Sequence, residues 1–327
     1  MISNAMIQKW IKMLRHDSVL HVEQDEGKYY SVSEIAGYYN NFCGKIQNTK
    51  NIDKSGIPQN IASHGNDREQ VYFPIAIFQY GLGAYDLWLE TKKRDYYNAF
   101  LAMADWAVSN QEKSGAWNTF GVLHYNNPYS SMAQGEGASL LARAYKETEN
   151  QKYYTACTKA IDFMLLPVAE GGTSEYSPDG LILKEYPDKA PVLNGWIFSA
   201  FGLFDAWKLT GKLEYSEAWK QTSDGIKNSL CKFDAGHWSY YDMGGKLTSP
   251  FYHSLHIELL KALNHLLPNS EYERYIDKWS IEKNSWIGIR WLLYERLCKR
   301  LPKSRRRNGL WSAENAASSN QDIWSNI

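Results

Sequence analysis

The sequence has few of the features that identify common classes of protein. Its four cysteines are far apart and form no CxxC pair, so neither a zinc site nor a disulfide scaffold is indicated. The 36 Lys and Arg balance the 36 Asp and Glu, which gives no global attraction to nucleic acid or to an anionic membrane. There is no P-loop, GxSxG, HExxH or strand-associated GxGxxG, so phosphoryl and hydride transfer have no support. We therefore expect no cofactor and no nucleic-acid partner.

Long apolar runs are also missing. No stretch approaches the roughly 20 apolar residues of a membrane span. In the first 14 residues, the charged Lys9 and Lys12 lie among apolar residues such as Trp10 and Leu14. This segment therefore lacks the continuous apolar region of a signal peptide. The sequence predicts a cytoplasmic protein with no membrane span.

Aromatic residues, in contrast, are abundant. They make up 14% of the 327 residues and include 13 Trp and 23 Tyr. Large amphipathic side chains pack well between helices, and flat hydrogen-bonding rings also suit the faces of sugars. Composition leaves both interpretations open.

A long repeat gives the best indication of the fold. Four segments share a helix of small and apolar residues, a short polar turn, and a second helix that opens on a tyrosine. These tyrosines are spaced by 57, 62 and 57 residues and are Tyr96, Tyr153, Tyr215 and Tyr272. A period this long, made of helix pairs, predicts stacked helical hairpins.

The first helix of each pair is the more apolar and carries repeated glycines, such as Gly135 and Gly202. Because glycine is costly inside a helix, its recurrence indicates close approach of neighbouring helices or of a ligand. We place the first helices as the inner ring of a mainly α fold, an (α/α) toroid. The loops that precede them would then gather at one rim, where a cleft is expected.

The ends of the chain look different from the repeat. Residues 1–70 predict a short N-terminal helix followed by a layer of strands and loops, and residues 71–301 the toroid. Residues 302–327 continue a basic run and are rich in Ser, Asn and Ala, as is typical of a solvated tail. The apolar first 15 residues and the basic tail also offer docking surfaces for a second copy of the chain, so a homodimer stays open.

Polar and ionisable groups concentrate in three rim segments, 129–137, 184–196 and 238–256. Each group also has an ordinary explanation as a helix cap, a solvated charge or a surface residue. His253 and His256, three residues apart, have the spacing of a metal-binding pair but lack a third ligand at characteristic spacing, so we predict no metal site.

Six motifs in these segments, taken in order along the chain, resemble the D-glucuronyl C5-epimerase family. The resemblance runs from about residue 38 to about residue 267. The motifs are Tyr72 to Leu82, Ser131 to Gly135, Glu185-Tyr186-Pro187, Val192 to Gly195, Tyr241-Asp242 and Tyr252 to His256.

The resemblance implies an isomerase that converts D-glucuronate to L-iduronate by inversion at C5 within a heparosan-like glycosaminoglycan. It places the family's active-site residues on Glu185, Tyr186, Tyr241 and Tyr252. Removing the C5 proton on one face and returning a proton on the other needs a base and an acid on opposite sides of the sugar. We expect Tyr186 and Tyr252 to flank the ring, with Glu185 orienting the site or acting as the second base.

The substrate would be a uronate-containing oligo- or polysaccharide. We expect its carboxylate and hydroxyls to meet further polar and aromatic side chains of the rim. These are His253, His256, Asn194, Gln134, Glu136, Tyr80 and Trp196.

Three alternatives remain open at this point. A uronate polysaccharide lyase begins with the same removal of the C5 proton. A glycoside hydrolase would need two carboxylates across the cleft, for which Glu136, Glu185 and Asp242 are candidates. A carbohydrate-binding protein would keep the aromatic groove without the chemistry.

Overall fold

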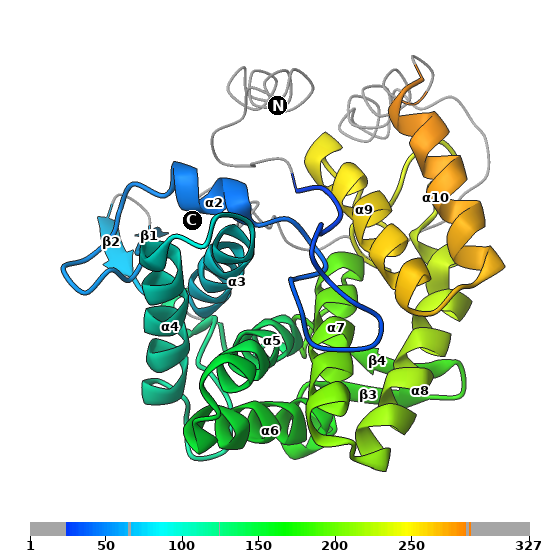
Figure 1. The fold of residues 1–327 in the computed structure, drawn as a ribbon. Helices are drawn as coiled ribbons and strands as arrows, with labels where there is room; N and C mark the ends of the chain where they lie inside the picture. Colours follow the sequence, from blue (N-terminus) through cyan, green and yellow to red (C-terminus); the bar gives the residue numbers. More distant parts are fainter. Residues whose placement is uncertain (1–23, 65–66, 124, 286–287, 289–327) are drawn as a thin grey trace.

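The described part of the chain is built mainly of four helical hairpins (Figure 1). The structure is a computed structural model, and it describes residues 24–64, 67–123, 125–285 and 288. In each hairpin a buried inner helix is followed by a more exposed outer helix. The hairpins are α3 (Pro74–Thr91) with α4 (Arg94–Ser109), α5 (Ser131–Thr148) with α6 (Gln151–Leu165), α7 (Leu193–Thr210) with α8 (Leu213–Ser229), and α9 (Pro250–Leu266) with α10 (Ser270–Lys283). The prediction of a mainly α, (α/α) toroid fold is confirmed.

The repeated tyrosines join successive outer helices. Each is the third residue of its outer helix, and three of them bond back to the outer helix before. The phenol of Tyr153 donates to Asp105 on α4 at 2.7 Å, and that of Tyr215 donates to Asp162 on α6 at 2.5 Å. Tyr272 donates to the carbonyl of Ser223 on α8 at 2.8 Å. The sequence repeat therefore marks a ladder of bonds around the outer ring.

Close packing of the inner helices depends on glycine. Gly135 of α5 and Gly202 of α7 lie back to back, and a Cβ atom on Gly202 would stand 2.2 Å from the Gly135 carbonyl oxygen. Real Cβ atoms do not approach an oxygen this closely, so any larger residue would push the two helices apart. The expected close approach of inner helices is confirmed here.

The N-terminal segment enters the ring of inner helices. Tyr38 stacks on Phe198 at 6.4 Å between ring centroids, and Tyr39 lies 4.5 Å from Phe201. These residues belong to the same hydrophobic core as the helices. The sequence predicted only a separate layer of strands and loops for this part of the chain.

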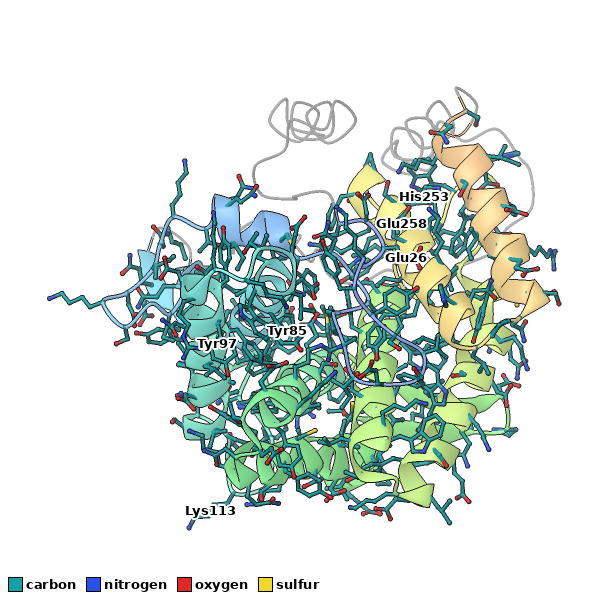
Figure 2. The ribbon with its side chains drawn as sticks, viewed as in Figure 1. Glu26, Tyr85, Tyr97, Lys113, His253 and Glu258 are labelled. Carbon is teal, nitrogen blue, oxygen red and sulfur yellow. The ribbon has the colours of Figure 1, made fainter. Side chains whose placement is uncertain are left out.

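Polar contacts tie this segment to three inner helices. Asp86 of α3 accepts a bond from the backbone nitrogen of Tyr38 at 2.9 Å, and Arg143 of α5 donates to the carbonyl of Gly37 at 2.8 Å. Figure 2 shows Glu26 beside Glu258 of α9, whose carboxylate accepts a bond from the Glu26 backbone nitrogen at 3.3 Å. The segment thus spans the opening between α3 and α9 (Figure 1).

Short elements complete the described chain. The helix α2 (Cys43–Asn48) precedes the antiparallel pair β1 (Asn60–His64) and β2 (Asp67–Val71), in which Asn60 faces Val71. A second antiparallel hairpin, β3 (Ser174–Ser177) and β4 (Gly180–Leu183), follows α6, where the sequence predicted a hairpin loop. Single 3-10 turns lie at η1 (Gly121–Leu123), η2 (Val168–Glu170) and η3 (Leu230–Phe233).

Some predictions concern residues outside the described ranges. The predicted helix within residues 1–14 and the basic tail at 302–327 both fall there. Among the helices that are described, none is long and apolar enough to cross a membrane.

Candidate active site

The loops before α7 and α9 are joined to each other and to the start of α5. The backbone nitrogen of Leu193 donates to the carbonyl of Tyr241 at 3.2 Å, and that of Met243 donates to Pro191 at 3.0 Å. The nitrogen of Ser131, at the beginning of α5, donates to the carbonyl of Lys184 at 3.1 Å. Three motifs that are distant in sequence therefore converge at the N-terminal ends of the inner helices.

Four tyrosines gather at this point, and we call them the tyrosine cluster: Tyr125, Tyr186, Tyr241 and Tyr252. The ring of Tyr186 stacks on Phe120 with centroids 4.5 Å apart, and Tyr125 lies 5.9 Å from Tyr186. Tyr241 and Tyr252 meet edge to face at 5.0 Å. Burial raises the pKa of Tyr186 well above its ordinary value, and the neighbouring Glu185, Tyr125 and Tyr252 raise it further. The Tyr186 phenol is therefore a proton donor at neutral pH.

Glu185 is completely buried beside this cluster. Its carboxyl group packs against the first turn of α7, where a Cβ atom on Gly195 would stand 2.3 Å from Oε2. Neither carboxyl oxygen makes a close hydrogen bond within the described residues, although the Tyr186 phenol is near enough to interact with the carboxyl group. Burial raises the pKa of Glu185 to about 8, although the Tyr186 phenol, Lys246 and Lys189 oppose that rise. A carboxyl group with this pKa can exchange protons near neutral pH.

Two lysines supply positive charge to the tyrosine cluster. The ammonium nitrogen of Lys189 lies 3.8 Å from the centre of the Tyr125 ring and 4.8 Å from that of Tyr186. The ammonium of Lys246 lies 4.9 Å from the Tyr241 ring. Sequence analysis missed both lysines, as well as Tyr125. The only available signal was their short distance in sequence from motif residues.

A second group of polar atoms lies deeper, among the inner helices. Glu136 of α5 is fully buried; its Oε1 accepts a bond from Gln79 Nε2 at 2.8 Å, and its Oε2 has no partner in the described structure. Asn194, at the start of α7, is 2% exposed and its Oδ1 is likewise unpartnered. Burial raises the pKa of Glu136 well above its ordinary value; Gln79 and Lys45 oppose this rise, and Glu185 adds to it.

Three of the predicted substrate-binding residues instead make contacts within the helical framework. The amide of Gln134 donates to the carbonyls of Gly115 and Ala160 at 2.9 and 3.1 Å and accepts from the nitrogen of Trp117 at 3.1 Å. Trp196 donates to Thr222 of α8 at 2.7 Å. Tyr80 of α3 interacts electrostatically with Tyr96 of the outer helix α4. We leave Gln134, Trp196 and Tyr80 out of the proposed substrate contacts.

His253 and His256 are both buried on α9, and Figure 2 marks His253. The ring of His253 stacks on Trp238 at 3.8 Å, and its nitrogens contact Ser239 Oγ at 2.9 Å and the carbonyl of Trp279 at 3.2 Å. The ring of His256 lies 6.1 Å from that of Trp279. Burial lowers the pKa of each imidazole to about 3. Since the contacts of His253 are internal and both rings lie against Trp279 of the outer helix α10, we also leave these two residues out.

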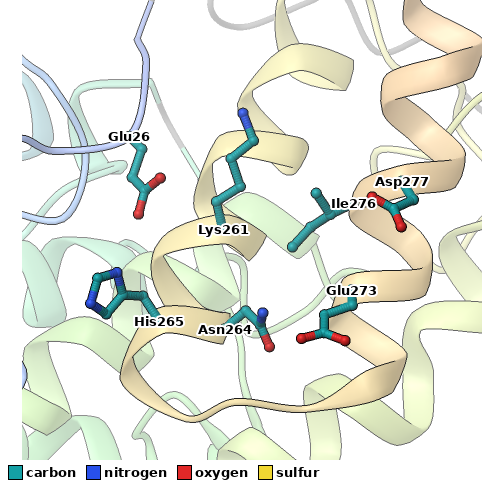
Figure 3. A pocket seen from close by; sticks show the side chains of 7 residues that line it. All are labelled: Glu26, Lys261, Asn264, His265, Glu273, Ile276 and Asp277. Carbon is teal, nitrogen blue, oxygen red and sulfur yellow. The ribbon is translucent and has the colours of Figure 1, made fainter.

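No group of three or more His, Cys, Asp or Glu that could hold a metal ion occurs among the described residues. A hollow of about 490 Å³ lies elsewhere, between α9, α10 and the N-terminal segment (Figure 3). It is lined by Glu26, Lys261, Asn264, His265, Glu273, Ile276 and Asp277. None of these residues belongs to the tyrosine cluster.

Comparison with known proteins identifies the family. The sequence model of the D-glucuronyl C5-epimerase C-terminus matches residues 106–281, which is more than half of the chain. The chain belongs to this family. The matched region contains Glu185 and all four tyrosines of the tyrosine cluster.

Two relatives illustrate the range of this similarity. The D-glucuronyl C5-epimerase of Caenorhabditis elegans is 29% identical over 219 residues, which are 58% of this chain and 36% of the nematode protein. An uncharacterized protein of Methanocaldococcus jannaschii is 27% identical over 205 residues, 56% of this chain and 67% of that protein. The chain thus spans about a third of the length of the nematode epimerase.

Solved structures show weaker similarity. The unsaturated glucuronyl hydrolase of Bacillus sp. GL1 aligns with 64% of this chain and 60% of its own at a TM-score of 0.44 and 16% identity. A family 76 mannosidase of Bacteroides thetaiotaomicron aligns with 63% of this chain and 57% of its own at 0.42 and 15% identity. At scores below 0.5 we transfer no residue role from either enzyme.

Proposed function

We propose that this protein is a uronate C5-epimerase that converts D-glucuronate to L-iduronate in a heparosan-like oligo- or polysaccharide. Membership of the D-glucuronyl C5-epimerase family supports the class of reaction. The observation that carries the proposal is Glu185, a buried carboxyl group in contact with the tyrosine cluster whose pKa burial raises to about 8. A carboxyl group with this pKa supports the role of proton acceptor near neutral pH, beside phenols that keep their protons.

The reaction begins at the C5–H bond of the uronate. A base takes the C5 proton, the electron pair of that bond forms a C5=C6 double bond, and negative charge gathers on the carboxylate oxygens. Positive charge and hydrogen-bond donors stabilise this species, since they act where the charge develops. Lys189 and Lys246 provide two such cations beside the phenols. Reprotonation of C5 from the other face then gives the inverted sugar.

Glu185 is the better base, because the pKa of Tyr186 is far above neutral pH whereas that of Glu185 is about 8. Tyr252, which is on α9 and contacts Tyr241, returns the proton from its phenol. Tyr186 and Tyr241 hydrogen-bond the carboxylate, and Asn194 holds a sugar hydroxyl through its free acceptor oxygen. Proton balance is restored when protonated Glu185 releases its proton to solvent and the Tyr252 phenolate takes one up.

The decisive experiment measures deuterium incorporation at C5. The protein is incubated in D₂O with a glucuronate-containing polymer, and the sugar is analysed by NMR. We expect deuterium at C5 and a mixture of glucuronate and iduronate, with no chain cleavage. Glu185→Gln and Tyr252→Phe should each slow incorporation on the order of 100-fold or more, since each removes a proton-transfer group.

A matched control is Tyr176→Phe, which removes an exposed phenol that bonds the carbonyl of Leu165 and no residue of the tyrosine cluster. It should leave the rate unchanged. Absorbance from an unsaturated uronate would instead identify a lyase, and a new reducing end without unsaturation a hydrolase. Binding of the polymer with no exchange at C5 and no cleavage would indicate a carbohydrate-binding protein without catalytic activity. Any of these three outcomes overturns the proposal.

A further inference from the structure

The second buried carboxyl group in this part of the molecule is Glu136, on the inner helix α5. Its side chain has no exposed surface, and its two oxygens differ in their surroundings. Oε1 accepts a hydrogen bond from Gln79 Nε2 at 2.8 Å, and Oε2 has no partner among the described residues. This asymmetry fits a neutral carboxylic acid, in which one oxygen is a carbonyl acceptor and the other carries the proton.

Glu136 lies close to the candidate base. The backbone nitrogen of Ser131, at the start of α5, donates a hydrogen bond to the carbonyl of Lys184. This bond fixes the segment that carries Glu185 to the beginning of the helix that carries Glu136. Helices α5 and α7 touch backbone to backbone at Gly135 and Gly202, and the carboxyl of Glu185 rests on the first turn of α7. The charges of Glu136 and Glu185 interact across this contact.

The groups that face Glu136 come from several elements. Tyr38 of the N-terminal segment interacts electrostatically with it, and its own buried hydroxyl has no partner among the described residues. Gln79 faces it from α3, Glu185 from the loop before α7, and Lys45 from α2. Lys45 forms no ion pair with Glu136 within 4.0 Å, and burial lowers the pKa of the Lys45 ammonium to about 8 although Glu136 opposes this change. Since a carboxylate without a close cation is costly to bury, the proton stays on Glu136.

We propose that Glu136 is a second catalytic residue, a neutral carboxylic acid whose Oε2 hydroxyl donates a hydrogen bond to the carboxylate of the bound uronate. This inference rests on the proposed function, because it assigns the acceptor as the group on C6 of the same sugar. The unpartnered hydroxyl of Glu136 has no acceptor in the described protein, and a uronate carboxylate supplies one. A buried neutral acid stabilises developing negative charge strongly, because it needs no reorganisation and works in a low dielectric.

In this arrangement the two carboxyl groups have different roles. Glu185 exchanges the C5 proton, and Glu136 keeps its own proton while it holds the carboxylate oxygen. The hydrogen bond from Glu136 becomes stronger as charge moves from C5 to that oxygen. It therefore stabilises the transition state more than the bound substrate, and it increases the rate of reaction as well as the affinity.

The test is infrared spectroscopy of protonated carboxyl groups, which needs no activity. At pH 7 the wild-type protein should show C=O stretches of buried acids. Glu136→Gln should remove one of them, distinct from the band that Glu185→Gln removes, because Glu185 with a pKa of about 8 is also largely protonated at that pH. The matched control is Glu282→Gln on α10, which replaces another buried carboxyl group away from the site and should leave the Glu136 band in place. A glucuronate oligosaccharide should shift the Glu136 band to lower frequency, and the same oligosaccharide with its carboxylates reduced to alcohols should not.

Exchange at C5 gives the second measurement. Glu136→Gln keeps the side-chain shape and the contact with Gln79, and it should lower the rate on the order of 100-fold with little change in KM. Should that variant fail to fold, Gln79→Leu tests the same point, because losing the donor to Oε1 should shift the Glu136 band.

The outcomes separate the two proposals. A wild-type protein without C5 exchange, but with a Glu136 band that responds to the oligosaccharide, would contradict the epimerase assignment and retain the acid as a carboxylate-binding group. Absence of the band at pH 7, or an unchanged exchange rate in Glu136→Gln, would overturn the role of Glu136 and leave the epimerase proposal standing.

Discussion

Arg143 and Asp205 form an ion pair at 2.6 Å between α5 and α7, inside the ring of inner helices. Asp205 also accepts a bond from the phenol of Tyr39 at 2.6 Å, and Arg143 also donates to the carbonyl of Gly37. One buried pair therefore joins two inner helices to the N-terminal segment.

Breaking this pair should destabilise the whole protein. Arg143→Met leaves the Asp205 charge buried without its cation, so we expect a loss of about 4 kcal/mol in the free energy of unfolding. Urea denaturation followed by circular dichroism measures it. The double variant Arg143→Met/Asp205→Leu should recover part of the loss. If the loss in the double variant equals the sum of the losses in Arg143→Met and Asp205→Leu alone, the two side chains are not coupled in this way.

The ladder of outer-helix tyrosines predicts a graded effect on stability. Tyr153→Phe removes the bond to Asp105, and Tyr215→Phe removes the bond to Asp162 with a longer contact to the Thr158 carbonyl. Each variant should cost about 1 kcal/mol in thermal unfolding. Tyr96→Phe is the matched control, since its helix α4 has no outer helix before it in the described chain. Equal losses in all three variants would argue against the ladder.

The two lysines of the tyrosine cluster should act on binding of an anionic sugar. Lys189→Met and Lys246→Met should each raise KM for the uronate polymer about tenfold, which corresponds to about 1.4 kcal/mol. The salt dependence of KM should weaken as well, because fewer charges are paired on binding. Lys227→Met on α8 removes an equivalent charge away from the site and should change neither quantity.

The two buried histidines should make the free energy of unfolding depend on pH. Their pKa values are about 3 in the folded protein, against about 6.5 when unfolded. Below about pH 6.5 the unfolded chain binds protons that the folded protein excludes. Stability should therefore fall as the pH drops from about 6.5 toward 3, by up to about 1.4 kcal/mol per pH unit for each histidine.

Unfolding titrations of His256→Leu at several pH values test this dependence. The variant should lose about half of the acid sensitivity in that range. His265→Gln replaces an exposed imidazole of the same helix and should keep the wild-type pH profile. A profile unchanged in His256→Leu would contradict the assignment.

The hairpins could be predicted because each unit of the repeat carries helix start and stop signals that lie close together in the sequence. Each tyrosine is the third residue of an outer helix, and three of the four inner helices end at a threonine, at Thr91, Thr148 and Thr210. These are short-range signals of helix start and stop, and they can be read from one sequence. The convergence of Glu185 and the motif tyrosines followed from the same register.

The N-terminal segment was harder to predict, because its contacts are distant along the chain. Tyr39 meets Phe201 and Asp205, about 160 residues away, and nothing in its local sequence marks that destination. The histidines show a different limit. The spacing of His253 and His256 is the same for a binding pair as for two core residues, and only burial against Trp238 and Trp279 separates these cases.

The segment that carries Tyr38 and Tyr39 also affects where the protein can be divided. The family model matches residues 106–281, so a fragment cut to that match would omit this segment and almost all of the first hairpin. Such a fragment would expose the aromatic faces of Phe198 and Phe201 and leave Arg143 without the Gly37 carbonyl. We expect it to aggregate when expressed alone. We therefore expect the smallest autonomously folding unit of this protein to be longer than the region that the family model matches.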